Sequence, residues 1–290
     1  AGMHKQGGLP IPDIHHIDPP FWFADGGDLS PDEYGLVAAR RLEQKILELG
    51  PDRVAAFIGE PIMGAIGVYI PPMTYWKEIE RICRQYDVLL VADEVICGFG
   101  RTGEWFGSQY FGITPDVMTL AKGITSGYIP LGAAMFNDRV AGVLKNQGGE
   151  LAHGCTYSGH PVCTAVALEN IRLLEEEGIV ARARNEIAPY LAQRWAELGE
   201  HRLVGEARIA GMVGALELVP RKPERAFFEE RGKVGVMCRD IALRNGLILR
   251  ATYDSMLLSP PLILTREQVD ELFEKAWKSL NETAAALGMS

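Results

Sequence analysis

The sequence is poor in cysteine, and the few cysteines show no pairing pattern. Five of the 290 residues are cysteine, an odd number without a C-x-x-C spacing. A disulfide framework and a cysteine-based structural zinc site are therefore excluded, and we expect no bound metal. A reducing compartment fits best, so we expect a cytoplasmic protein.

Long apolar runs and basic clusters are missing as well. No stretch approaches the roughly 20 apolar residues that span a bilayer, and residues 1–20 lack the layout of a signal peptide. The net charge is −9, and the basic residues are scattered along the chain. We therefore expect neither a membrane nor a nucleic acid as a partner. A Walker or dinucleotide-type glycine loop is also absent, so a phosphate-bearing ligand would need local donors.

The composition is that of a globular protein that can bury a sizeable hydrophobic core. Hydrophobic residues make up 47% and charged residues 23% of the chain. Residues 1–34 are rich in Gly, Pro, His and Asp and predict an irregular lead-in. From Pro31, apolar residues recur at helical spacing until Gly50-Pro51, which predicts one helix that ends there.

Short apolar runs then alternate with a helical stretch. Residues 54–58, 88–92, 117–121 and 131–136 predict buried strands, and residues 74–86 predict an amphipathic helix. Continuous apolar strands separated by helices indicate a mainly parallel sheet that is covered on both faces. The fold class is therefore α/β in this part of the chain.

The second half has a looser order, which indicates a smaller C-terminal α+β domain. We expect a large domain over residues 1–172 and a small domain over residues 173–290. The predicted elements are helices at 161–177, 180–198, 234–244 and 266–287, and extended segments at 212–218, 247–250 and 256–259.

Two predicted strand ends carry chemically useful side chains, Asp93 and Lys122. Parallel sheets bind ligands at the carboxyl ends of their strands. An isolated lysine is usually a surface group, but glycines and Pro130 follow Lys122 and predict a tight, specific backbone. An amine that is partly desolvated there, close to another cation, can act as a nucleophile and a base.

Asp93 and Glu94 could suggest a pair of catalytic carboxylates. Adjacent residues on a strand point to opposite sides, however, so a dyad is not expected. Asp93 and Val95 lie two apart and would share a face, presenting a carboxylate and an apolar surface to one ligand. The alternative is a solvated acidic turn that follows a core strand.

Taken together, several motifs resemble the class III, or omega, aminotransferases of fold type I, and among them the amine:pyruvate and putrescine:pyruvate transaminases. The resemblance covers essentially the whole chain, and Asp93 and Lys122 stand 29 residues apart, as in the family. The motifs that carry it are Gly59-Glu60-Pro61-Ile62, the Asp93 segment, Pro115-Asp116, the Lys122 segment, residues 153–161 and residues 258–262.

This resemblance implies a pyridoxal 5'-phosphate (PLP) site. Lys122 would form the Schiff base with PLP and later transfer a proton between the substrate and the cofactor. Asp93 would pair with the pyridinium nitrogen, which makes the ring an electron sink. Val95 would pack on the ring, and Thr156 would reach the cofactor phosphate of a neighbouring subunit, in a homodimer or tetramer.

The resemblance also implies a site for the substrates, an amine donor and a 2-oxo acid acceptor. Arg250 matches the family's mobile arginine, which binds a substrate carboxylate through two parallel hydrogen bonds. A structural salt bridge is the alternative for this arginine. Glu60 is similar to the glutamate that lies near this arginine in related enzymes, so we expect it at the substrate site.

The sequence departs from the family in two respects. Family members carry a segment ahead of the first residue here that supplies the phosphate cup and part of the substrate pocket, so we expect a large domain that lacks its N-terminal part. Met63 and Ile66 also replace the usual Gln and Gly.

The motifs together lead us to expect PLP-dependent transamination. The alternatives are a non-catalytic fragment that still dimerises, and another fold type I enzyme such as an aminomutase or a decarboxylase.

Overall fold

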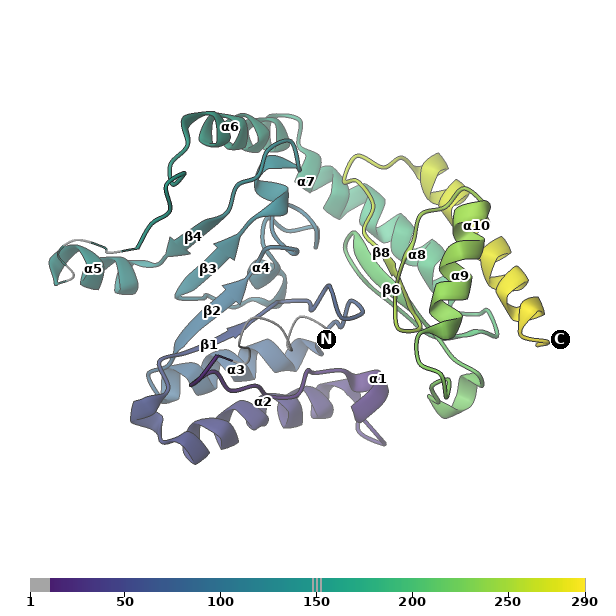
Figure 1. Cartoon of the computed structure of the whole chain (residues 1–290), viewed down its shortest axis with the longest axis horizontal. Coiled ribbons are helices and arrows are strands. Elements are labelled where there is room, and N and C mark those ends of the chain that lie inside the picture. Colours follow the sequence, from purple (N-terminus) through teal and green to yellow (C-terminus); the bar gives the residue numbers. More distant parts are fainter. Residues whose placement is uncertain (1–10, 148, 150, 152, 290) are drawn as a thin grey trace.

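Two β-sheets organise the chain in this computed structural model, which describes residues 11–147, 149, 151 and 153–289. The first sheet lies in the N-terminal half, and the second lies in the C-terminal half (Figure 1). Helical segments that follow α6 (Pro161–Glu176) lead the chain from the first region to the second. None of the described helices is both long and apolar enough to cross a lipid bilayer.

The first sheet has the strand order β1-β2-β3-β4, with β1 and β2 parallel and β2 and β3 parallel. The fourth strand runs antiparallel to the third. The connection between them holds only the short turn η3 (Lys122–Thr125), so the chain turns back instead of crossing over the sheet. The mainly parallel sheet is confirmed. The strands are β1 (Ala56–Gly59), β2 (Leu89–Asp93), β3 (Val117–Leu120) and β4 (Ala133–Phe136).

Helices α2 (Pro31–Leu49) and α3 (Met73–Gln85) lie side by side next to the first sheet (Figure 1). Ser30 caps the start of α2, because its hydroxyl and backbone N–H form a capping box with Glu33. The lead-in is less irregular than expected, because the short helix α1 (Trp22–Asp25) precedes α2; residues 1–10 lie outside the described residues.

Several short elements were not predicted. They have too few residues to show a helical period in the sequence. These are η2 (Pro51–Arg53), α4 (Gly107–Phe111) and α5 (Asp138–Asn146).

The second sheet is antiparallel throughout, in the order β5-β6-β8-β7. Helix α8 contacts β5, α9 contacts β7 and β8, and α10 packs against both helices. The predicted smaller α+β region is confirmed, although the expected single helix at 180–198 is interrupted by a π-helical turn. The elements are α7 (Ile179–Arg182), the π turn η4 (Ala183–Ile187), α8 (Ala188–Leu198), β5 (Val204–Ala210), β6 (Val213–Leu218), η5 (Lys222–Glu224), α9 (Lys233–Arg244), β7 (Arg250–Thr252), β8 (Ser255–Leu258) and α10 (Arg266–Ala286).

The strand β6 is shared by the two main hydrophobic cores. Every one of its residues is buried. Val213 and Ala215 pack in the core of the first region, whereas Leu216 and Leu218 pack in the core of the second. Successive side chains of a strand point to opposite faces, so one strand can serve both cores. The predicted domain boundary at residues 172 and 173 falls inside α6 and remains a prediction.

Two arginines, the half-buried Arg101 and the buried Arg208, connect the regions. The guanidinium of Arg101 donates to the carbonyls of Met212 and Pro260, at 3.0 and 2.5 Å, and burial lowers its pKa to about 10. Arg208, on β5, donates to the carbonyls of Gly67 and Val68, at 2.6 and 2.9 Å. Both arginines therefore hold loops of the first region against the second sheet.

Candidate active site at the strand ends

Asp93 is the last residue of β2, and its carboxylate is held from two sides. Thr119, its partner on β3, donates its hydroxyl to Oδ1 at 3.1 Å. The backbone N–H of Val95 donates to the same oxygen at 3.1 Å. Among the described residues no donor reaches Oδ2, so this second oxygen keeps its capacity to accept a hydrogen bond.

The neighbouring Glu94 points the opposite way, as the alternation along a strand predicts. It is fully buried, and its two oxygens accept the backbone N–H groups of Gly107 and Ser108, at 2.8 and 2.6 Å, where α4 begins. Burial raises the pKa of Glu94, while these hydrogen bonds oppose the shift. Glu94 therefore stabilises the start of α4 and forms no dyad with Asp93.

Lys122 follows β3 and opens the turn η3. Its φ is +43°, in the left-handed region that non-glycine residues seldom adopt. The turn is anchored by Asn170 of α6, whose side-chain amide donates to the carbonyls of Gly123 and Ile124 at 3.0 and 3.1 Å. The lysine itself is exposed, so the partial desolvation expected from the sequence is not found in this chain.

Glu60 brings a second carboxylate to the same place. It follows β1, where Gly59 pairs with Ala92, and its Oε2 accepts the backbone N–H of Gly64 at 2.9 Å. Burial raises the pKa of Glu60, and the charge of Asp93 adds to this, while the Gly64 N–H and the Lys122 ammonium oppose it. The structure thus brings Glu60, Asp93 and Lys122 together.

Arg250 is the first residue of β7, at the edge of the second sheet, and it is exposed. Within the described part of the chain it forms no ion pair, so the alternative of a structural salt bridge finds no partner there. Its strand touches the loop that follows Glu60, because the Thr252 hydroxyl donates to the Ala65 carbonyl at 3.3 Å. Arg250 therefore lies on a strand that borders the strand-end site.

Thr156 stands apart from the other candidates. It begins an exposed turn that precedes α6, and its hydroxyl forms no hydrogen bond with the residues that the structure describes. Within this chain it is therefore not brought to Asp93 or Lys122 by any hydrogen bond.

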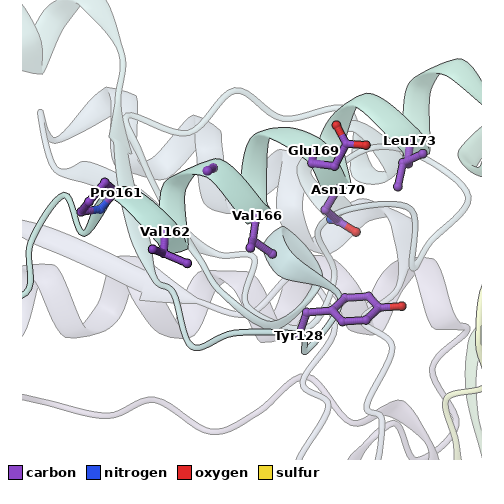
Figure 2. Close-up of a pocket in the computed structure, with 8 residues that line it drawn as sticks. Tyr128, Pro161, Val162, Val166, Glu169, Asn170 and Leu173 are labelled. Carbon is purple, nitrogen blue, oxygen red and sulfur yellow. The ribbon is translucent and has the colours of Figure 1, made fainter.

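An open hollow of about 660 Å³ lies against α6, close to the anchored turn. In Figure 2, Val162, Val166 and Asn170 project from the helix toward Tyr128, which follows the turn. The lining is apolar except for Glu169 and Asn170. The hollow lacks the lysine and the carboxylates that lie at the strand ends.

Three supporting residues were not found from the sequence: Thr119, Asn170 and Gly64. Thr119 is 26 residues from Asp93 in sequence, and only the register of two neighbouring strands brings them together. Asn170 is 47 residues from Gly123. An apolar or helical pattern carries no signal of such contacts.

The family model for class III aminotransferases matches residues 3–280. The chain belongs to the class III aminotransferases. Its sheets and helices are those of the fold type I transaminases, and the resemblance proposed from the motifs is confirmed.

Two curated relatives illustrate the similarity of this class III aminotransferase chain. A putrescine–pyruvate aminotransferase of Pseudomonas aeruginosa is 59% identical over 285 residues, which are 98% of this chain and 62% of the relative. A diaminobutyrate–2-oxoglutarate transaminase of Halomonas elongata is 43% identical over 294 residues, with 98% and 62% covered. The chain therefore spans about three fifths of the length of these relatives.

Solved structures agree with the sequence matches. The crystal structure of an omega transaminase from Pseudomonas jessenii in complex with PMP is 41% identical and superimposes with a TM-score of 0.93. The superposition covers 100% of this chain and 64% of that chain.

Proposed function

We propose that the chain serves PLP-dependent transamination, in which an amino group moves from an amine donor to pyruvate or another 2-oxo acid. The observation that carries this proposal is the junction of Lys122 and Asp93 at neighbouring strand ends, with one oxygen of Asp93 left to accept from a ligand. Family membership supports it, since class III aminotransferases use PLP.

The side chains at the strand ends have the chemistry that PLP requires. A carboxylate suits a protonated ring nitrogen, and a primary amine suits an aldehyde. We assign Asp93 to the ring nitrogen, with Thr119 holding the carboxylate in place, and Val95 to the apolar contact with the ring. Lys122 is assigned to the cofactor's aldehyde carbon.

In this role the amine of Lys122 acts as nucleophile and then as proton carrier. PLP, when bound, supplies a conjugated ring that accepts the electron pair released at the substrate carbon. The Nζ atom of Lys122, released when the substrate amine takes its place on the cofactor, would take the proton from that carbon and pass it to the cofactor's aldehyde carbon, and it would move a proton in the opposite direction in the return half-reaction. The anchoring of its turn by Asn170 keeps Nζ within a limited space.

Arg250 is proposed to bind the carboxylate of the acceptor. A guanidinium presents parallel N–H groups that match a carboxylate, and Arg250 is exposed and unpaired within the described residues. An amine donor without a carboxylate would leave this group unused.

We further propose that the active assembly contains two copies of the chain. Val162 and Leu173 of α6 are 55% and 37% exposed, and Tyr128, which lines the same hollow, is 86% exposed. Exposed apolar residues gathered on one helix mark an interaction surface. Thr156 lies just before this helix. If a second copy covered α6, the hydroxyl of Thr156 could reach the phosphate of the cofactor bound by that second copy.

The exposure of Lys122 also favours a second candidate, a chain that folds and dimerises but does not catalyse. Borohydride reduction in the presence of PLP, followed by peptide mass mapping, separates the two. A stable adduct on Lys122, together with pyruvate-dependent consumption of an amine donor, supports the enzyme. Absence of any adduct supports the non-catalytic chain.

An aminomutase or a decarboxylase is the alternative within fold type I. A panel of amine donors with pyruvate tests this point, with alanine as the measured product. Adduct formation without alanine from any donor would favour these alternatives over transamination.

A further inference from the structure

The turn that carries Lys122 touches the loop of residues 94–106, which follows Asp93. A Cβ added to Gly123 would lie 2.9 Å from Cβ of Phe99 and 3.3 Å from the carbonyl oxygen of Gly98, so turn and loop approach as closely as a glycine allows. Phe99 also belongs to the same buried hydrophobic cluster as Ile124, the next residue of the turn. The Lys122 turn therefore rests directly on the loop that follows Asp93.

Turn and loop both contain backbone conformations that need support. The φ angle is +60° at Phe99, and it is +43° and +48° at Lys122 and Ser126. These values lie in the left-handed region, which is unfavourable for residues other than glycine. Such conformations persist only where the surrounding structure holds them in place. The Lys122 turn therefore depends on contacts beyond its own few residues.

Asn170 of α6 supplies such contacts with every polar atom of its side chain. Its amide nitrogen donates to the carbonyls of Gly123 and Ile124 at 3.0 and 3.1 Å. Its Oδ1 accepts the hydroxyl of Ser126 at 2.7 Å. Ala167 of the same helix lies in the hydrophobic cluster that contains Ile124. One side chain thus binds three of the residues that follow Lys122.

The direction of these hydrogen bonds argues against a role confined to α6. An asparagine that served its own helix would bond to neighbouring backbone groups or to water. All three bonds of Asn170 leave the helix instead, and they end on one turn that lies 44 to 47 residues away in sequence. The neighbouring Glu169 behaves differently, because it pairs with Arg172 on the same helix. Asn170 is therefore directed at the Lys122 turn.

We propose that Asn170 is a positioning residue, which holds the Lys122 turn against the loop that follows Asp93 and thereby sets the spacing between the amine and the carboxylate. The proposal rests on the proposed function, in which these two groups meet different atoms of one cofactor. A rigid ligand that meets both groups reacts fastest when their spacing matches it, and a misplacement of about 1 Å can lower the rate about a hundredfold. Asn170 acts through the turn and needs no contact with the cofactor or the substrate.

The first test compares two lysines of the same folded chain. PLP is added, samples are reduced with borohydride after short times, and peptide mass spectrometry gives the initial rate of adduct formation at Lys122 and at the exposed Lys77. Asn170→Asp keeps the size of the side chain and an oxygen for Ser126, but it places a second oxygen against the two carbonyls. The ratio of the Lys122 rate to the Lys77 rate should fall about tenfold. A merely structural role of Asn170 would lower the stability of the chain and leave this ratio unchanged.

Ser126→Ala provides the second variant, because it removes the hydroxyl that orients the Asn170 amide and adds no charge. The ratio should fall about threefold. Glu175→Gln, at an exposed carboxylate on the same helix, should leave the ratio unchanged. The wild-type ratio in Asn170→Asp overturns the proposal. If that variant does not fold, Ser126→Ala decides: a lowered ratio supports the proposal, and the wild-type ratio overturns it.

Hydrogen exchange separates this proposal from the proposed function, because it needs no cofactor. The N–H groups of Ile124, Ser126 and Tyr128 bond to carbonyls within the turn, so they exchange when the turn opens. In Asn170→Asp these amides should exchange about tenfold faster, and the amides of α6 should exchange as in the wild type.

A wild-type chain that forms no adduct on Lys122 would contradict the proposed function. Exchange would then decide, because faster exchange of the turn in Asn170→Asp supports the role of Asn170 and unchanged exchange overturns it. A wild-type chain that forms the adduct, together with an unchanged ratio in Asn170→Asp, would contradict only the role of Asn170.

Discussion

The two sheets carry their charged residues in opposite ways. In the second sheet, Arg208 and Glu217 are 8% and 1% exposed and pair with each other at 2.9 Å, and Ser255 bonds to both. At the strand ends of the first sheet, Lys122 is exposed and Asp93 keeps one oxygen without a donor among the described residues.

The difference separates structural from functional charge. A buried ion pair holds two regions together, and its burial keeps it from a ligand even where one oxygen, Oε1 of Glu217, has no hydrogen-bond partner among the described residues. Charged groups that are positioned by hydrogen bonds but left half-satisfied have capacity for a ligand. Removal of a charge should therefore cost stability in the second sheet and activity in the first.

The largest effect is expected for Lys122→Ala. Because the amine is exposed and forms no ion pair with the described residues, the free energy of unfolding should change by less than about 0.5 kcal/mol. The borohydride-trapped PLP adduct and all pyruvate-dependent turnover should disappear. Urea denaturation and adduct mapping measure the two quantities. Turnover near the wild-type rate would refute the assignment of Lys122.

Arg208→Met should have the converse effect, on stability. It leaves Glu217 buried without its cation, so we expect a loss of about 3–5 kcal/mol in the free energy of unfolding, measured with urea. The double variant Arg208→Met with Glu217→Met should recover part of this loss, since the Glu217 charge is no longer buried and only the more exposed Glu206 loses its cation. A single variant as stable as the wild type would show that the pair does not join the regions.

Thr119→Val should have a smaller effect, limited to the active site. It removes one hydrogen bond to the Asp93 carboxylate, and a bond to a charged group contributes about 1.5 kcal/mol, or roughly tenfold in rate. Initial rates with an amine donor and pyruvate measure this change. Thr114→Val, at an exposed threonine after α4, serves as the control. Equal rates in both variants would mean that the function of Asp93 does not depend on the hydrogen bond from Thr119.

The smallest effect concerns the pH dependence of stability through Glu94. Its pKa is raised by burial above the ordinary 4.5, so its neutral form favours the folded state. This contribution is complete below about pH 4.5 and is lost as the pH rises through the folded-state value. Relative to Glu94→Gln, the wild type should therefore lose stability as the pH rises from about 4.5 toward neutrality.

Thermal unfolding of wild type and Glu94→Gln in matched buffers tests this slope. Gln caps α4 less well than Glu, so the variant is expected to be less stable at every pH. The informative quantity is how the difference in stability between wild type and variant changes with pH. Glu229→Gln, at an exposed carboxylate, should show no such change. A difference that stays constant with pH would indicate that Glu94 is ionised equally in both states.

Much of the first sheet could be predicted from the sequence, because its strands are continuous apolar runs. β3 begins at Val117 as expected, and the ends of β1 and β2 differ from the prediction by one or two residues. β5 was missed because Glu206 and Arg208 interrupt its apolar pattern, although their mutual ion pair allows both to be largely buried. The sequence cannot show that two charges will neutralise each other.

Only part of the candidate site could be predicted from the sequence. Asp93 and Lys122 could be located because each directly follows an apolar strand. Thr119 and Asn170 support them only through the register of β2 and β3 and the packing of α6, which depend on the order of elements in space. The direction of β4 could not be predicted either, because an apolar run looks the same in a parallel and an antiparallel strand.

The sharing of β6 between two cores has a consequence for how the chain unfolds. If either core opened alone, it would expose one face of β6 while the other face stayed packed, and the ladder to β5 and β8 would be strained. Opening one core alone would expose apolar surface to water, which is unfavourable, and the chain would gain little conformational entropy in return because β6 stays held. The two regions, distinct in topology, should form a single cooperative unit in which the amides of β6 exchange with solvent only when the whole chain unfolds.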